Sequence, residues 1–119
     1  MRDQEKESAV KEFVRRVKKK YSNKVEKIIL FGSYARGDYG EENDIDVLIV
    51  GDVSIDELID ISFPLLLKHG VYISPHVMTE EHFGLLDTAG YGFVKNVKRE
   101  GKVIMPEFED YLTRAVWAG

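Results

Sequence analysis

The chain has 119 residues, of which 44% are hydrophobic and 11% aromatic, and its formal net charge is −4. This length fits one domain around one hydrophobic core, and the hydrophobic content excludes an intrinsically disordered chain. The acidic balance argues against a dedicated nucleic-acid-binding protein. No apolar run approaches the roughly 20 residues of a membrane span, and no signal peptide is expected. The absence of cysteine excludes disulfides and thiolate metal sites and favours a cytoplasmic location.

The first predicted element is an amphipathic helix over residues 3–21, because apolar residues recur there at helical spacing. These apolar positions are Val10, Phe13, Val14, Val17 and Tyr21. Many basic residues lie on the same segment, and they are read as a solvated face rather than a binding patch. Residues 25–31 are apolar and partly β-branched, which predicts a buried strand that ends at Gly32 and Ser33. A short helical turn is expected at residues 34–36.

A second strand is predicted over residues 44–50, followed by a helix with clear end signals. Ser54 and Glu57 form a capping-box signature at the start of this helix, which is expected to end at Gly70. Pro64 stands inside the helix. An interior proline costs roughly 3 kcal/mol unless the helix bends, so a kink or a break is predicted there.

Short elements are predicted in the next part of the chain. Residues 71–78 predict a third strand, and Pro75 places it at an edge of the sheet or at a bulge. A short helix after Thr79 and a longer helix over residues 88–100 are expected to follow. A brief strand is predicted at residues 102–105.

The last predicted element is an amphipathic helix beyond Pro106. Its apolar positions are Phe108, Tyr111, Leu112, Ala115 and Val116. The aromatic residues of this helix and Trp117 fit either the core of the same domain or an interface with another protein. The predicted fold class is mixed α/β (α+β), with a small mixed β-sheet flanked by helices. We expect a single domain over residues 1–119, with a core at about 24–105 between two terminal amphipathic helices.

Asp44 and Asp46 stand two positions apart on the second predicted strand, so both side chains leave the same face, roughly 7 Å apart along the backbone. Two like charges on one side of an apolar strand repel each other or share a proton unless cations join them. Carboxylate oxygen is a preferred ligand of Mg²⁺, which binds through one or two carboxylates together with substrate phosphates. Taken alone, however, an Asp-x-Asp pattern favours two solvated residues at the entrance of a strand.

Gly32 and Ser33 follow a buried strand and open a helical turn, where free backbone N–H groups and the positive end of a helix can hold phosphate. Glycine allows the backbone to approach closely, and the serine hydroxyl adds a donor. Alone, this is an ordinary strand-to-helix turn. The joint pattern is Gly-Ser, ten intervening positions and Asp-x-Asp at the start of another strand. By chance it is expected in roughly one chain in a thousand of this length.

The residues LFGSYARGD at 30–38 and NDIDVLIV at 43–50 resemble the signature of the minimal nucleotidyltransferases of the DNA polymerase β superfamily. The resemblance implies binding of an NTP with Mg²⁺, with ATP the expected substrate, and transfer of the nucleoside monophosphate to a hydroxyl with loss of pyrophosphate. Many small relatives are antitoxins paired with HEPN-type ribonuclease toxins, and some transfer AMP to a tyrosine of the toxin. The expected partners are therefore an NTP and a small helical HEPN-type protein. A homodimer is a further possibility, and we expect binding to neither a membrane nor nucleic acid.

The same resemblance implies a role for each motif residue. Asp44 and Asp46 would hold two Mg²⁺ ions about 3.5–4 Å apart, one activating the attacking hydroxyl and one binding the triphosphate. Gly32 and Ser33 would cradle the terminal phosphates, where positioning and charge neutralisation provide most of the catalysis. Arg36 matches an arginine of the family, and it either contacts phosphate or braces the loop by pairing with a nearby aspartate.

One feature departs from the family pattern. Active members place a third carboxylate on a later strand, and residues 72–78 contain none. The best alignment puts His76 at that position. A neutral imidazole can accept a proton but suits Mg²⁺ poorly, and a plain polar residue on an edge strand also explains His76. His69 and His82 are expected to be surface residues beside helix ends.

Two functions of different kinds follow from these observations. The first is an Mg²⁺-dependent nucleotidyltransferase that transfers AMP from ATP to a hydroxyl on a partner HEPN-type toxin. The alternative is a catalytically weakened or inactive antitoxin that acts by nucleotide-dependent or simple protein binding, as the missing third carboxylate indicates. A transferase acting on small molecules ranks last, because the chain is short for an additional acceptor-binding domain.

Overall fold

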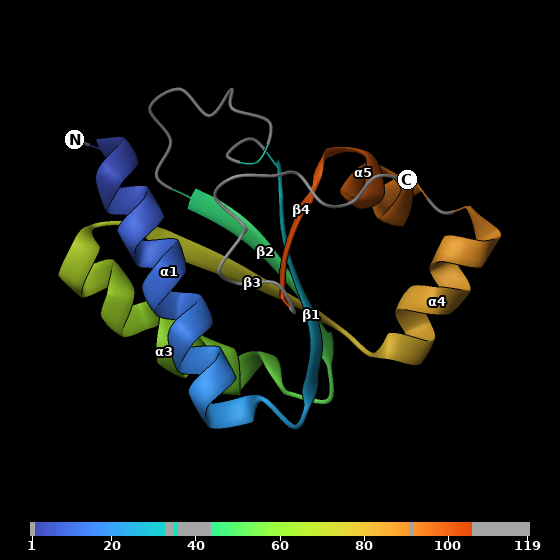
Figure 1. The fold of residues 1–119 in the computed structure, drawn as a ribbon, viewed down its shortest axis with the longest axis horizontal. Helices are drawn as coiled ribbons and strands as arrows, with labels where there is room; N and C mark the ends of the chain where they lie inside the picture. Colours follow the sequence, from blue (N-terminus) through green and yellow to red (C-terminus); the bar gives the residue numbers. More distant parts are fainter. Residues whose placement is uncertain (1, 33–34, 36–43, 91, 106–119) are drawn as a thin grey trace.

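The computed structural model describes residues 2–32, 35, 44–90 and 92–105, and Figure 1 shows how their elements are arranged. In chain order the elements are α1 (Arg2–Tyr21), β1 (Val25–Phe31), β2 (Asp44–Gly51), α3 (Ile55–His69), β3 (Tyr72–Met78), α4 (Glu80–Ala89), α5 (Gly92–Glu100) and β4 (Lys102–Met105). The predicted turn at 34–36 and the predicted helix beyond Pro106 include residues outside the described ones. The predicted mixed α/β class, with a small mixed sheet flanked by helices, is confirmed.

The sheet has the strand order β3-β2-β1-β4. β1 runs antiparallel to both β2 and β4, whereas β2 and β3 are parallel. A parallel pair needs a crossover connection, and α3 provides it between β2 and β3. β3 is an edge strand, as Pro75 predicts, because proline cannot donate a hydrogen bond to a strand on each side.

Alternate residues of the strands face two separate cores. The core shared with α1 and α3 includes Phe13, Val17, Ile28, Leu30, Ile45, Val47, Ile49, Leu58 and Leu65. The core shared with α4 and α5 includes Ile29, Leu48, Val50, Phe83, Val94 and Val97. Figure 1 shows α1 and α3 lying side by side, away from α4 and α5. By the same alternation, the first carboxylates of β2 lie on the face that α4 and α5 cover farther along the strand.

The end signals of α3 are confirmed. Of the two outcomes predicted at Pro64, the break is wrong, and the kink stays a prediction. The backbone N–H of Glu57 donates to the Ser54 hydroxyl at 3.1 Å, and the Glu57 carboxylate accepts from the Ser54 N–H at 2.9 Å. Gly70 caps the other end with a left-handed φ of 70°. Between these caps α3 continues through Pro64 as one helix of 15 residues. Asp60 and Pro64 are both exposed, so water can bind the Asp60 carbonyl that loses its usual N–H partner.

The region after β3 also differs from the prediction. Thr79 caps α4, as expected, by accepting a hydrogen bond from the His82 N–H at 3.0 Å. α4 extends to Ala89 and stops there because Gly90 adopts a left-handed φ of 75°. The single longer helix predicted from residue 88 is therefore wrong at its start. No helix of the described residues is long and apolar enough to cross a membrane.

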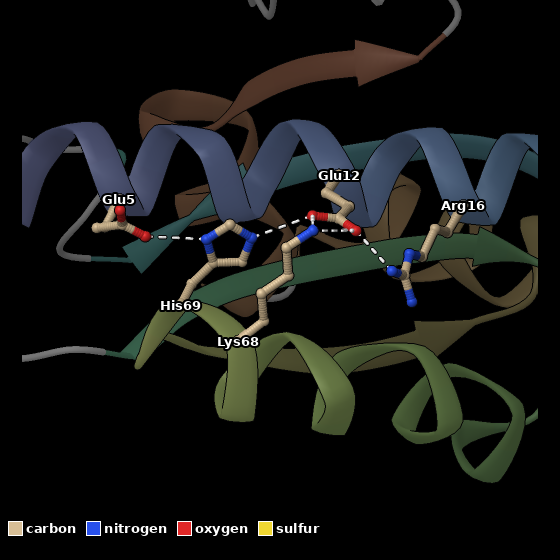
Figure 2. Close-up of polar contacts among 5 residues, drawn as sticks. All are labelled: Glu5, Glu12, Arg16, Lys68 and His69. Carbon is tan, nitrogen blue, oxygen red and sulfur yellow. Dashed lines mark hydrogen bonds and ion pairs between the residues drawn. The ribbon is translucent and has the colours of Figure 1, made fainter.

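A polar cluster joins α1 to the last turn of α3, as Figure 2 shows. The His69 ring bridges two carboxylates of α1, with Nδ1 2.9 Å from Glu5 Oε1 and Nε2 3.0 Å from Glu12 Oε1. Glu12 also accepts from Lys68 at 3.1 Å and from Arg16 at 2.5 Å. The His69 side chain is only 11% exposed, so the expected surface position of His69 is wrong. The packing of α3 against α1, which no local signal reveals, covers it.

This arrangement favours a doubly protonated His69 ring, because each ring nitrogen must donate to a carboxylate. The hydrogen bond to Glu12 raises the pKa of His69 above its usual 6.5, with Glu5 adding to the effect. In return, the hydrogen bond from His69 is the largest cause that lowers the pKa of Glu12 to about 2, followed among the favourable contacts by Lys68 and Arg16. The cluster therefore stabilises the contact between α1 and α3 in its charged form.

The pH dependence of unfolding follows from these two shifts. The contribution of His69 to the free energy of unfolding is complete below pH 6.5 and is lost as the pH rises through its raised folded-state pKa. The contribution of Glu12 is complete above pH 4.5 and is lost as the pH falls towards about 2. We expect urea unfolding to show a stability loss of about 1 kcal/mol between about pH 6 and about pH 9 from this cluster.

The variant His69→Gln is expected to lose this decrease between pH 6 and pH 9 and to be less stable at pH 6 by about 1–2 kcal/mol. His82→Gln, on exposed α4, serves as the control and should keep the wild-type pH profile. An unchanged profile in His69→Gln would show that the cluster does not couple protonation to folding.

Candidate active site

β2 begins with two carboxylates on one face. Asp44 is exposed and the Asp46 side chain is 35% exposed, whereas Ile45 between them is buried. The strand is regular at this point, because Asp46 pairs with Phe31 of β1 on one side and with β3 on the other. The structure therefore places Asp44 and Asp46 on the same side of the sheet, as predicted, at the end where the chain enters β2.

The glycine of the Gly-Ser corner lies directly against this acidic pair. Gly32 follows the last residue of β1 and has a φ of 78°, a left-handed conformation that favours glycine. A Cβ added at Gly32 would collide with Oδ2 of Asp46 and would lie 3.2 Å from its Cγ. Two motifs separated by a loop in the sequence therefore meet in space, and the absence of a side chain at Gly32 leaves the room that the Asp46 carboxylate occupies.

His76 approaches the same carboxylate from the neighbouring strand β3. Its Nε2 is 3.4 Å from Oδ1 of Asp46, and its side chain is 44% exposed. The ring meets Phe31 edge-on, with 5.2 Å between ring centroids and an interplanar angle of 65°. In the parallel register His76 stands opposite Leu48, two residues beyond Asp46, so its ring reaches back towards the start of β2. Three predicted site residues, Gly32, Asp46 and His76, are thus in mutual proximity around one carboxylate.

Not every predicted site residue can be placed. Ser33 and Arg36 lie outside the described residues, and their contacts with phosphate stay predictions. Within the described part of the chain, no group of three His, Asp or Glu side chains is arranged to hold a metal ion. Glu80 and Glu81 lie in the first turn of α4, beyond the far end of β3, and so do not supply a third carboxylate at this site.

Phe31 also borders the site, although its place in the sequence predicts only a residue of a buried strand. Its ring contacts the imidazole of His76 and also packs against the core beneath α4 and α5. The alternation of β1 puts Phe31 on the same face as Ile29, and this much is visible in the sequence. The pairing of Phe31 with Asp46 depends on the register between β1 and β2, which no local pattern reveals.

The arrangement of these groups suits phosphate transfer. Two carboxylates on one strand face offer hard oxygen donors that suit a divalent cation together with phosphate oxygens. The adjoining glycine corner lets backbone approach a bound phosphate closely, and a neutral imidazole beside it can accept a proton. The fold and these groups together are those expected of an enzyme that transfers a phosphate-containing group from a nucleotide.

Comparisons with known proteins identify the group more closely. The family profile described as "Nucleotidyltransferase domain" matches residues 10–104. A protein of Methanocaldococcus jannaschii named "Putative protein adenylyltransferase" is 54% identical over 98 residues, which cover 82% of this chain and 96% of the relative. A second protein with this name from the same organism is 42% identical over 71 residues, covering 56% and 72% of the two chains. The chain belongs to the nucleotidyltransferase domain family and is a nucleotidyltransferase.

Solved structures share the fold at low sequence identity. A toxin–antitoxin with AMP-PNP aligns with a TM-score of 0.55 at 19% identity, covering 86% of this chain and 78% of the other. A mutant of the toxin–antitoxin MntA-HpeT aligns with a TM-score of 0.53, also at 19% identity, covering 83% and 75%. These likenesses confirm the predicted nucleotidyltransferase-like fold.

Proposed function

We propose that this nucleotidyltransferase transfers AMP from ATP to a hydroxyl on a small partner protein, of the HEPN toxin type. The observation that carries the proposal is the close approach of Gly32 to the Asp46 carboxylate, which joins the phosphate-binding corner to the acidic pair. Two relatives are named for adenylyl transfer to protein, which supports AMP as the group and a protein as the acceptor. Two proteins of similar fold were solved as toxin–antitoxin complexes, one of them with AMP-PNP.

The residues present at the site fit Mg²⁺. Mg²⁺ usually retains several waters and binds through one or two carboxylates and substrate phosphates rather than through an all-protein cage. Asp44 and Asp46 provide two such carboxylates on one face of β2. Bound there, Mg²⁺ would supply charge neutralisation at the triphosphate and a lower pKa of the acceptor hydroxyl.

In the proposed transfer the oxygen of the acceptor hydroxyl attacks the α-phosphorus of ATP. A new P–O bond forms while the bond from the α-phosphorus to its bridging oxygen breaks, and pyrophosphate leaves with that electron pair. Asp44 and Asp46 would hold Mg²⁺ for the nucleotide phosphates, and the Gly32 corner lets the backbone approach these phosphates. Ser33 and Arg36 would add donors to the phosphate oxygens.

His76 would receive the proton of the hydroxyl in this scheme. Its Nε2 lies within reach of Oδ1 of Asp46, so the tautomer that carries a proton on Nε2 can donate to this carboxylate. That tautomer leaves Nδ1 free of a proton and able to accept one. The position that a third carboxylate fills in the family would then be filled by an imidazole.

Transfer of labelled AMP tests the proposal. The full chain is incubated with Mg²⁺, α-labelled ATP and a HEPN-type protein as the candidate acceptor, and the products are separated by gel and mass spectrometry. The expected result is a partner heavier by one AMP, with release of pyrophosphate, and loss of the label when EDTA is present. A partner that stays unlabelled with each of the four NTPs would contradict transfer to protein.

The same assay tests His76. His76→Gln is expected to lower the rate of transfer by about 10²–10⁴-fold without weakening nucleotide binding, because it removes the proton acceptor and leaves the carboxylates in place. His82→Gln on α4 is the matched control and should transfer at the wild-type rate. A wild-type rate in His76→Gln would show that His76 is a polar residue of an edge strand and has no role in transfer.

The missing third carboxylate favours one second candidate, an antitoxin that neutralises its partner by binding alone. This candidate predicts that the double variant Asp44→Ala plus Asp46→Ala still rescues cells that express the partner. The transferase predicts the opposite, loss of rescue together with loss of the AMP label, so a growth assay separates the two.

A further inference from the structure

β3 carries two further side chains on the face of the sheet that holds the site. Tyr72 and Ser74 pair with the two carboxylates of β2 in the parallel register, and residues paired in this way point to the same side of the sheet. Ile73 between them belongs to the core beneath α1 and α3. Tyr72 and Ser74 therefore share the opposite face with His76, and β3 presents two hydroxyls and an imidazole in one row beside the acidic pair.

The fold itself makes little use of the polar groups of Tyr72 and Ser74. Both residues are half-buried. Among the residues that the structure describes, neither hydroxyl has a hydrogen-bond partner, and the Tyr72 ring has no ring contact. The hydroxyl of a tyrosine usually finds a hydrogen-bond partner when the ring is buried. These two side chains are therefore available to a molecule bound at the site.

The Asp46 carboxylate lies between two different neighbours. An added Cβ at Gly32 would collide with Oδ2 of Asp46, whereas Oδ1 lies 3.4 Å from Nε2 of His76. Gly32 follows β1 and His76 belongs to β3, and these two strands flank β2 on opposite sides. The site therefore has a glycine side and a β3 side, with the Asp46 carboxylate between them.

The proposed transfer gives these two sides different tasks. Displacement at the α-phosphorus places the attacking and leaving oxygens roughly in line, on opposite sides of the phosphorus. The terminal phosphates, which leave as pyrophosphate, lie on the glycine side in this scheme. The acceptor hydroxyl then enters from the β3 side, where His76 can take its proton. β3 is an edge strand, so in the described part of the sheet no further strand stands in the way of this approach.

We propose that Tyr72 and Ser74 form the acceptor side of the site and contact the protein segment that carries the acceptor hydroxyl. The Tyr72 ring provides contact area, since aromatic side chains contribute strongly to binding between proteins. The small side chain of Ser74 keeps the position beside Asp46 open for the hydroxyl. This assignment rests on the proposed function, because it uses the proposed place of the phosphates.

The first experiment measures AMP transfer to the HEPN-type protein at varied acceptor concentration, together with calorimetric binding of ATP in the presence of Mg²⁺. Tyr72→Ala is expected to raise KM for the acceptor by about tenfold or more, while kcat and the Kd of ATP stay within about twofold of the wild-type values. Tyr72→Phe keeps the ring and should restore most of the affinity for the acceptor. A weaker binding of ATP in Tyr72→Ala would place the ring against the nucleotide and overturn the proposal.

Tyr21→Ala is the matched control for loss of a half-buried tyrosine. Tyr21 packs against the core beneath α1 and α3, on the other face of the sheet. This variant should keep the wild-type KM for the acceptor. An equal rise of this KM in both alanine variants would show that the effect comes from stability and not from contact, and would overturn the proposal.

Ser74 is tested by size. Ser74→Leu fills the position beside Asp46 and is expected to lower transfer to the protein by about tenfold or more without weakening the binding of ATP. Ser74→Ala removes only the hydroxyl and should transfer at nearly the wild-type rate. Loss of ATP binding in Ser74→Leu would assign this position to the nucleotide and contradict the proposed acceptor side.

Cross-linking distinguishes a wrong acceptor side from a wrong function, because it does not depend on transfer. The variant Tyr72→p-benzoylphenylalanine keeps an aromatic ring on β3 and makes it photoreactive, and the same change at Tyr21 is the control. If the HEPN-type protein is labelled with AMP but cross-links equally from both positions, the acceptor side is wrong and the transferase stands. If it cross-links from position 72 alone and is never labelled, the contact stands and the transferase is wrong. Absence of both label and cross-link would overturn both.

Discussion

Asp46→Asn is expected to lower nucleotidyl transfer by about 10³-fold or more. The substitution keeps the size of the side chain but removes the negative charge that lies against Gly32 and beside His76. Without that charge the site loses one of its two hard oxygen donors for a divalent cation. The measurement is the initial rate of AMP transfer, together with calorimetric binding of ATP in the presence of Mg²⁺.

The thermal stability of Asp46→Asn should not fall together with its activity. Asp44 and Asp46 are like charges on one strand face, so removing one relieves repulsion in the absence of a cation. The midpoint of thermal unfolding should therefore stay equal or rise. Asp52→Asn, at the opposite end of β2, serves as the control and should change neither rate nor nucleotide binding. A rate for Asp46→Asn within a few-fold of the wild-type rate would show that the acidic pair has no part in the transfer mechanism.

The second large effect is expected for Gly32→Ala. A Cβ at this position must occupy the space of the Asp46 carboxylate, and the φ of 78° is strained for any side chain. Displacing a reacting group by about 1 Å can cost about 10²-fold in rate, and we expect a loss of at least this size in AMP transfer. The left-handed backbone should also lower the free energy of unfolding by about 1–2 kcal/mol.

Gly70→Ala separates these two causes. Gly70 has a φ of 70°, close to that of Gly32, but nothing lies within 4 Å of an added Cβ. It should therefore lose a similar amount of stability and keep the wild-type rate of transfer. If the two variants lose activity equally, the effect of Gly32→Ala comes from the backbone of the fold and not from its contact with Asp46.

The two faces of the sheet carry different groups. One face of the sheet holds the carboxylates, the glycine corner and His76, and the other is covered by α1 and α3. The His69 cluster fixes the last turn of α3 to α1 on the face opposite the site.

The features that the sequence alone predicts are those set by interactions between residues close together in the chain. The alternation of residues 44–50 puts the carboxylates on one face and Ile45 in the core, because successive side chains of any strand point to opposite sides. The capping box at Ser54 and the left-handed Gly70 set the ends of α3 through hydrogen bonds within a few residues. The family itself was visible, since its motif needs nothing beyond a strand, a corner and a second strand.

The features that the sequence alone does not predict depend on contacts between residues far apart in the chain. The expected break at Pro64 fails because α3 is held by packing at both sides of the proline and exposes the freed carbonyl to water. The burial of His69 depends on glutamates 57 and 64 positions away in the sequence. The register of β1 with β2 brings Phe31 to His76 and Gly32 to Asp46. Periodicity cannot reveal such pairings, since it describes which side of an element is apolar but not which element that side meets.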